Sequence, residues 1–258
     1  MIVPDRESVG QAAAARIRRV IRGDPAASLG LATGSSPLTA YAALASLVET
    51  GDLDLTEATA FALDEYVGLL PHSEHSYAAT LLREVIRPLR MDPERIHVPD
   101  GSATDLQAAC ARFEEAIRRA GGIDLQILGI GANGHIGFNE PTSSLSSRTR
   151  IKTLAPRTRA DNARFFDGDL GRVPTHCLTQ GLGTIREATE IVLVAHGAEK
   201  AAAVAAAVEG PLTAMVPASA LQLHAQTTVI LDRAAASRLS LVEYYDHTLA
   251  NLPDWQRV

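Results

Sequence analysis

The chain has 258 residues, of which 46% are hydrophobic, 21% are charged and only 4% are aromatic, and its net charge at pH 7 is −6. This composition is typical of a globular protein that can form one large domain. The acidic balance, without a long run of Lys or Arg, argues against a groove for nucleic acid. The few aromatic residues argue against a surface on which bases stack.

The sequence also bears on the cellular compartment. Two cysteines, Cys110 and Cys177, lie too far apart to form a disulfide framework. The N-terminal segment carries charges and lacks the apolar core of a signal peptide. The longest apolar stretch is rich in Ala and is interrupted by Glu199, Lys200 and Glu209, so no membrane span is expected. We therefore expect a cytoplasmic protein.

Short apolar runs alternate with amphipathic stretches along the chain. Helices and strands are predicted, in chain order, as helix 8–22, strand 27–32, helix 37–49, strand 59–63, helices 76–89 and 105–120, strand 123–130, helix 158–166, strand 191–195, helix 198–208, strand 227–231 and helix 234–249. This pattern predicts an α/β fold with an open, mostly parallel, doubly wound (Rossmann-like) sheet and helices on both faces. Residues 1–258 are expected to form a single domain whose site lies at the carboxyl ends of the strands.

The first candidate site is the loop of Thr33, Gly34, Ser35 and Ser36, which connects a predicted strand to a predicted helix. Gly34 permits a tight turn, and the hydroxyl and free N–H groups could bind an anion such as phosphate. An ordinary helix start, with Ser36 as the N-cap and Pro37 at the first helical position, explains the same residues equally well.

An acidic pair, Asp64 and Glu65, directly follows the second predicted strand. If the two side chains point in opposite directions, only one of them enters a given site. A carboxylate there, beside a bound sugar, could remove a proton next to a carbonyl. A solvated turn or a helix N-cap is the more common role for such a pair.

Residues 129–134 formally match the glycine fingerprint of dinucleotide-binding proteins, and they follow a predicted strand. That fingerprint requires a helix N-terminus facing the pyrophosphate, and no helix is predicted to continue from this segment. We therefore reject a nucleotide site and interpret the segment as a turn that allows the backbone to approach a substrate.

The same loop carries three polar side chains, Asn133, His135 and Glu140. A histidine can move protons near pH 7, provided that a partner such as Glu140 or Asn133 fixes its orientation. His135, Glu140 and His176 are candidate metal ligands, but their spacing matches no metal motif, so no metal is expected. Two cations, Arg164 and Lys200, are candidates to pair with a phosphate. Most Lys and Arg residues, however, only make the protein surface soluble.

Seven segments together resemble one family: LATGSSPLTAY, ALDEYVGL, HSYAATL, LGIGANGHIGFNEP, SSRTRIKTLA, NARFF and LQLH. They are similar to the glucosamine-6-phosphate deaminases, also called isomerases, over nearly the whole chain. DEYVGL and NGHIGFNEP in combination are the most specific. The resemblance implies an enzyme of amino-sugar catabolism, without a metal or organic cofactor, that converts D-glucosamine 6-phosphate and water into D-fructose 6-phosphate and ammonia.

The resemblance also implies roles for individual residues. His135 would open the sugar ring with support from Asn133 and Glu140, and Asp64 would move the C2 proton to C1 before the resulting imine is hydrolysed. Some members carry Asp in place of Asn133, so Glu140 could carry more of the support here. The residues that match phosphate contacts or an aromatic near the active-site lid are Thr33, Gly34, Ser35, Ser36, Arg164, Lys200 and Tyr77.

Regulation and assembly remain open at this point. Some hexameric members respond to N-acetylglucosamine 6-phosphate at an interface site, and Ser143, Arg150 and Lys152 match residues of that site. Other members are monomeric and unregulated. The alternative function is that of a 6-phosphogluconolactonase-like hydrolase, which shares the fold but not the DEYVGL segment. A sugar-phosphate sensor is disfavoured because no DNA-binding segment appears.

Overall fold

A central sheet of seven strands organises the chain, and the computed structural model describes residues 1–253. All seven strands are parallel and lie in the order β1-β10-β9-β6-β2-β3-β5. Their bounds are β1 Ile2–Val3, β2 Ser28–Leu31, β3 Thr59–Ala62, β5 Ile96–His97, β6 Leu125–Leu128, β9 Glu190–Ala195 and β10 Thr227–Asp232. The predicted α/β fold with a parallel sheet is therefore confirmed.

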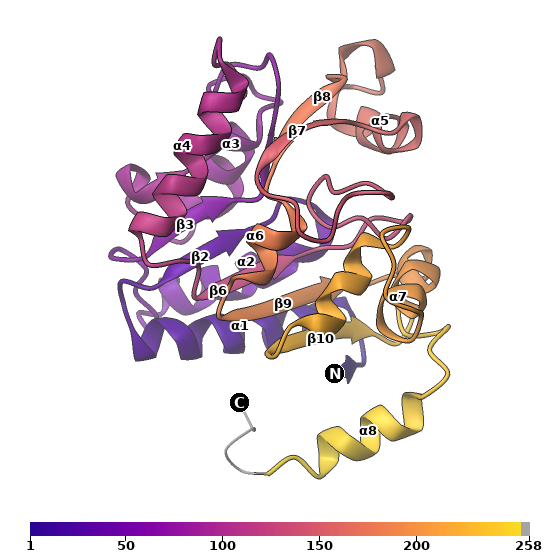
Figure 1. Ribbon diagram of the computed structural model, residues 1–258. Coiled ribbons are helices and arrows are strands. Elements are labelled where there is room, and N and C mark those ends of the chain that lie inside the picture. The colour runs from indigo at the N-terminus through magenta and orange to yellow at the C-terminus, as the bar shows by residue number, and fades with distance from the viewer. Residues whose placement is uncertain (254–258) are drawn as a thin grey trace.

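Helices cover both faces of this sheet, as predicted (Figure 1). The α-helices are α1 Arg6–Gly23, α2 Ser35–Glu49, α3 Tyr77–Leu81, α4 Leu106–Arg119, α5 Pro156–Asn162, α6 Leu182–Arg186, α7 Ala201–Val208 and α8 Val242–Ala250. Alternate residues of β9 show the two faces: Val192 and Val194 pack with α1 and α2, whereas Leu193 and Ala195 pack with α4, α6 and α7. Because neither face meets water, the strand is apolar at nearly every position.

The order of the strands fixes where a site can form. From β2 the chain continues to β3 and β5 on one side of the sheet, and from β6 it continues to β9 and β10 on the other side. Strands β2 and β6 are neighbours, so the loops that leave their carboxyl ends diverge from each other. Such a switch point leaves a crevice in which ligands of open α/β sheets bind.

A second sheet of three antiparallel strands, which the sequence did not predict, stands beside this crevice. Its strands are β4 Asp64–Tyr66, β8 His176–Thr179 and β7 Arg150–Thr153, in the order β4-β8-β7. In Figure 1, β7 and β8 rise away from the central sheet and carry α5 at their far end. Residues 150–179 are called the arm below.

One carboxylate attaches both ends of the arm to the central sheet's helices. Glu114 of α4 accepts hydrogen bonds from the backbone N–H of Thr149 at 2.8 Å and from the Thr184 hydroxyl at 2.6 Å. The guanidinium of Arg148 binds the other oxygen of Glu114 and also contacts Glu187. Thr149 lies just before β7 and Thr184 lies in α6, just after β8, so Glu114 links the two points where the chain crosses into and out of the arm.

Besides shifts of a few residues at the ends of other elements, three predictions differ from the structure. The last helix was expected over 234–249, but residues 233–238 form turns and α8 begins only at Val242. The helix expected over 76–89 consists of α3 followed by a π-helical turn, Leu82–Ile86. Asp64, expected to follow a strand, itself begins β4. Within residues 1–253, no helix is both long and apolar enough to cross a membrane.

Candidate active site

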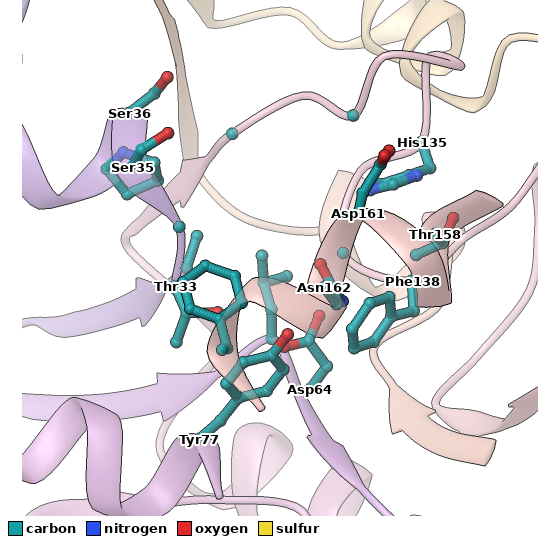
Figure 2. A pocket seen from close by; sticks show the side chains of 18 of the residues that line it. Thr33, Ser35, Ser36, Asp64, Tyr77, His135, Phe138, Thr158, Asp161 and Asn162 are labelled. Atoms are coloured by element: carbon teal, nitrogen blue, oxygen red, sulfur yellow. The ribbon is translucent and has the colours of Figure 1, made fainter. Parts of the chain in front are cut away.

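A cavity of about 450 Å³ occupies the crevice at the switch point. Its walls come from the loops after β2, β3 and β6, from α5 and from the start of α7. The view in Figure 2 places Ser35 and Ser36 at one end of the pocket, Asp64 and Tyr77 at another, and His135 on a further side. Nine of the residues predicted for the site line this cavity: Thr33, Gly34, Ser35, Ser36, Asp64, Tyr77, His135, Arg164 and Lys200.

The loop after β2 presents the start of α2 to the cavity. Gly34 has a φ of +110°, a conformation that side-chain-bearing residues rarely adopt, and it is the N-cap of α2. The alternative with Ser36 as N-cap is therefore wrong, because the helix already begins at Ser35. The first N–H groups of a helix have no partner within the helix, so this turn can donate hydrogen bonds to an anion in the cavity.

Two cations line the same cavity and lie near each other. Lys200 is half-buried directly before α7, and Arg164 lies after α5 with its guanidinium 4.7 Å from the centre of the Phe165 ring. Burial lowers the pKa of Lys200, Glu199 and Asp161 oppose that change, and Arg164 adds to it. A dianionic phosphate would relieve the repulsion between the two cations.

Asp64 is a buried carboxyl group that lies in the cavity without a hydrogen-bond partner among residues 1–253. Figure 2 shows it between the rings of Tyr77 and Phe138. Burial, with a further contribution from the charge of Glu65, raises the pKa of Asp64 to about 8. A carboxylate with so high a pKa is a far stronger base than an ordinary aspartate.

Glu65 points away from the cavity, so only one member of the acidic pair enters the site. Its carboxylate accepts hydrogen bonds from the backbone N–H groups of Tyr66 at 2.7 Å, Tyr77 at 2.9 Å and Ala78 at 2.8 Å. The interpretation of such a pair as a helix cap therefore describes Glu65, whereas Asp64 faces the pocket. Ser76 is the N-cap of α3 and accepts from the backbone N–H of Ala79.

His135 lies on the loop after β6, and Glu140 stands behind its ring. Nδ1 of His135 is 3.7 Å from Oε2 of Glu140, slightly beyond hydrogen-bond distance but within reach of an ion pair. Burial would raise the pKa of Glu140, but polar contacts with His135, Thr158 and Asn133, together with the positive charge of His135, outweigh burial and hold that pKa at about 2. Glu140 is thus a fixed negative charge beside the imidazole.

Asn133 supports Glu140 rather than the ring of His135. Its side-chain amide donates to Oε2 of Glu140 at 2.8 Å, and its oxygen accepts from the backbone N–H of His135 at 3.2 Å. The loop is also packed tightly against itself, since a Cβ atom on Gly131 would collide with the His135 ring. The glycine thus permits the close approach that places the imidazole at the wall of the cavity. As expected, no helix continues from this loop.

The structure adds residues that the sequence did not single out. Thr158, Asp161 and Asn162 project from α5 into the pocket (Figure 2), and the Asn162 amide donates to the Tyr66 hydroxyl at 2.9 Å. Tyr66 in turn accepts from the Tyr77 hydroxyl at 3.2 Å. The spacing of these three residues places them on one face of α5. That pattern is the same as the pattern of an ordinary solvent-exposed helix face, so the sequence did not single them out.

Five predicted residues do not line the cavity: Asn133 and Glu140, which lie behind His135, and the three candidate effector residues. Ser143 is buried and its hydroxyl has no partner within the described part of the chain. Arg150 donates to Oδ1 of Asn139 at 2.9 Å, and Lys152 lies on β7 opposite Cys177. Their role at an effector site stays a prediction. Residues 1–253 contain no group of three or more His, Cys, Asp or Glu side chains arranged to hold a metal ion.

Comparison with known proteins places the chain in one family. The family model described as glucosamine-6-phosphate isomerases/6-phosphogluconolactonase matches residues 5–230. The chain belongs to this family. Curated members with high similarity include the glucosamine-6-phosphate deaminase of Cutibacterium acnes, 58% identical over 96% of this chain and 95% of that protein. The glucosamine-6-phosphate deaminase of Streptomyces coelicolor is 55% identical over 100% of this chain and 99% of that protein.

Solved structures of the family separate its two branches. A monomeric glucosamine-6-phosphate deaminase has a TM-score of 0.90 and 41% identity, covering 92% of this chain and 98% of the other. The 6-phosphogluconolactonase from Trypanosoma cruzi has a TM-score of 0.73 at 17% identity, covering 93% and 96%. The second likeness shows the shared fold alone, whereas the first extends to the sequence.

Proposed function

We propose that this chain is a glucosamine-6-phosphate deaminase, which converts D-glucosamine 6-phosphate and water into D-fructose 6-phosphate and ammonia. The observation that carries the proposal is the placement of Asp64, a buried carboxyl with a raised pKa, in the same cavity as His135, behind whose ring Glu140 lies. The reaction needs a base for a carbon-bound proton and a separate group that moves protons between oxygens, and the cavity holds one of each.

In the first step the phosphate binds at the start of α2. The N–H and hydroxyl groups of the loop from Thr33 to Ser36 donate to its oxygens, and Arg164 and Lys200 supply positive charge. Each charge-assisted hydrogen bond contributes about 1.5–3 kcal/mol. This binding lies away from the reacting carbons and orients the sugar for the later steps.

In the second step His135 opens the ring. The imidazole accepts the proton of the anomeric hydroxyl while a proton is returned to the ring oxygen, which yields the open aldehyde. The imidazolium that forms on the way is stabilised by the fixed charge of Glu140, 3.7 Å from Nδ1. Asn133 holds Glu140 in place through its 2.8 Å hydrogen bond.

In the third step Asp64 acts on carbon. Its carboxylate removes the C2 proton next to the aldehyde, which gives an enolamine, and then returns a proton to C1. The product is an imine at C2, which water attacks; ammonia leaves and D-fructose 6-phosphate remains. Asp64 lies between Tyr77 and Phe138, so the carboxyl that takes the proton from C2 is also positioned to return one at C1 (Figure 2).

The proposal is tested by incubating the purified chain with D-glucosamine 6-phosphate and measuring ammonia and D-fructose 6-phosphate together. Equal amounts of both products are expected, and no ammonia from folded protein would refute the proposal. A parallel incubation with 6-phosphogluconolactone separates the two branches of the family, because lactone hydrolysis does not require Asp64. Adding N-acetylglucosamine 6-phosphate to the first incubation tests the predicted effector residues Ser143, Arg150 and Lys152.

We also propose that one chain, residues 1–258, forms a single functional domain that acts as a monomer in the cytoplasm. The central sheet and the arm of the same chain together supply the cavity's lining, and a relative with 41% identity is monomeric. Both cysteines, Cys110 and Cys177, are buried and free, as is typical of a reducing compartment. Sedimentation of the active enzyme tests this assignment, since a hexamer would contradict it.

A further inference from the structure

Glu65 is a buried charge that the proposed mechanism does not use. Its side chain is buried beside Asp64, and it points into the start of α3 instead of the cavity. Burying a carboxylate is costly unless hydrogen bonds compensate for the lost water. Here three backbone N–H groups, those of Tyr66, Tyr77 and Ala78, offset part of that cost, although burial still raises the pKa of Glu65 above its ordinary value.

These hydrogen bonds join the strand of the base to the wall of the cavity. Glu65 lies on β4, one residue after Asp64, whereas Tyr77 begins α3 and its ring lines the cavity. The Tyr77 ring lies 4.8 Å from that of Tyr66 and 5.9 Å from that of Phe138, measured between ring centres. Because the Glu65 carboxylate is bound to both β4 and α3, it fixes the distance between Asp64 and the Tyr77 ring.

Glu65 is also the charged group that acts on Asp64 from the same strand. The other titratable groups close to Asp64 are Tyr66 on β4, Tyr77 on α3 and Cys177 on β8, and burial raises the pKa of each. Those three are therefore neutral near pH 7. From the loop after β6, His135 also lines the cavity, and Glu140 stands behind it with its charge directed at His135.

We propose that Glu65 is a positioning residue for the deamination: it fixes Tyr77 and Asp64 relative to each other, and its negative charge opposes a second negative charge on Asp64. The inference rests on the proposed function. Through the first effect Glu65 aligns the base with C2 of the sugar. Through the second it makes the carboxylate of Asp64 hold a proton more tightly, which strengthens it as a base.

Two variants separate these effects. Glu65→Gln keeps the shape of the side chain, removes the charge and places an amide N–H against the Ala78 N–H. Glu65→Asp keeps the charge but is one methylene too short to reach α3. Glu209→Gln is the matched control, since Glu209 also accepts backbone N–H groups, those of Ser240 and Leu241, far from the cavity.

The readouts are kcat, KM and the pH profile of kcat/KM, together with a direct titration of the Asp64 carboxyl by carbon-13 NMR in the full chain. For Glu65→Gln we expect kcat to fall about tenfold or more with KM nearly unchanged. Removing a like charge lowers the pKa of Asp64, so its titration and the acid limb of the profile should move down by at least about half a pH unit. For Glu65→Asp we expect a lower kcat with the acid limb in its wild-type position.

A purely structural role for Glu65 would lower the melting temperature and leave the acid limb and the Asp64 titration unmoved; that result overturns the inference. If Glu65→Gln does not fold, Glu65→Asp carries the test, and an unchanged kcat in that variant overturns it. The NMR titration needs no turnover. A wild-type chain that releases no ammonia would thus refute the proposed function, while the effect of Glu65 on Asp64 would still be measured.

Discussion

Asp64 and Thr179 face each other across the antiparallel pair of β4 and β8, and Thr179 also holds the loop of His135. The Thr179 hydroxyl accepts the backbone N–H of Phe138 at 3.0 Å. One threonine thus connects the strand of the proposed base to the loop of the proposed ring-opening group. The second sheet, which was not predicted from the sequence, therefore helps to position both groups.

Thr179→Val keeps the shape of this side chain and removes its acceptor. The buried N–H of Phe138 then lacks a partner, which costs about 1–3 kcal/mol of unfolding free energy. We expect a matching loss of stability in urea unfolding and a several-fold lower kcat. Thr179→Ser, which retains the hydroxyl, should restore kcat; if it does not, packing rather than the hydrogen bond links the two segments.

Asp64→Asn should abolish the carbon step and spare binding. An amide cannot take the C2 proton, so we expect kcat to fall by a factor of about 10²–10⁴. Exchange of the C2 hydrogen with D₂O, followed by NMR, should disappear, while calorimetry shows substrate binding within a few-fold of wild type. Continued exchange would assign the base to another residue.

The same substitution should stabilise the fold at alkaline pH. The pKa of Asp64 is raised in the folded state to about 8, above its ordinary value of 3.8. For an acid raised in this way, folding is most favourable when it is protonated, and stability is lost as pH rises from the unfolded pKa through the folded pKa. Asp64→Asn, which stays neutral, should therefore melt above the wild type at pH 9. The two melting temperatures should converge near pH 4; a constant difference would contradict the raised pKa.

Glu140→Gln should impair ring opening alone. Because the pKa of Glu140 is about 2, its charge is present at every working pH, and the wild-type profile should show no limb from this group above pH 4. Without that charge the imidazolium of His135 is less stable, so we expect kcat/KM to fall about tenfold or more. An acyclic amino-polyol phosphate needs no ring opening and should still inhibit with unchanged affinity. Weaker inhibition would indicate a collapsed site instead.

Lys200→Ala should weaken phosphate binding. The loss of one charge-assisted contact, about 1.5–3 kcal/mol, predicts a KM for the sugar phosphate roughly 10- to 100-fold higher. Inorganic phosphate, tested as a competitive inhibitor, should lose affinity by a similar factor. Lys152→Ala is the control, because Lys152 lies outside the cavity, and in the absence of effector its KM should match the wild type. An unchanged KM in Lys200→Ala would place the phosphate elsewhere.

The parts of the site that follow buried strands could be predicted from the sequence. The loops at Thr33 and His135 come after β2 and β6, whose mainly apolar runs are easy to recognise. The two loops meet at the switch point because β2 and β6 are neighbours in the sheet. The sequence pattern does not contain this strand order, which was implied only by the resemblance to a family. Only the structure shows which of Asp64 and Glu65 faces the cavity, because the alternation of side chains along a strand does not say which member of the pair points inward.

The arm escaped prediction for physical reasons. The strands of the arm, β7 and β8, have only four residues each, and β7 is partly or fully exposed at every position, so its hydrophobic pattern is weak. The polar face of α5, with Asp161 and Asn162, faces a cavity rather than bulk solvent, and periodicity does not distinguish the two. Pairings across long sequence separations, such as that of Asp64 with Thr179, have no local signal.

The attachment of the arm to Glu114 has a consequence for how the chain assembles. Thr149 and Thr184 lie 35 and 70 residues beyond Glu114 in the sequence, yet both bind the same carboxylate oxygen. Contacts between such distant segments form only after long loops have closed, which slows them relative to local structure. We therefore expect the arm to take its final position only when α4, which carries Glu114, is in place, so that the cavity partly lined by the arm is complete only when both of its ends are bound.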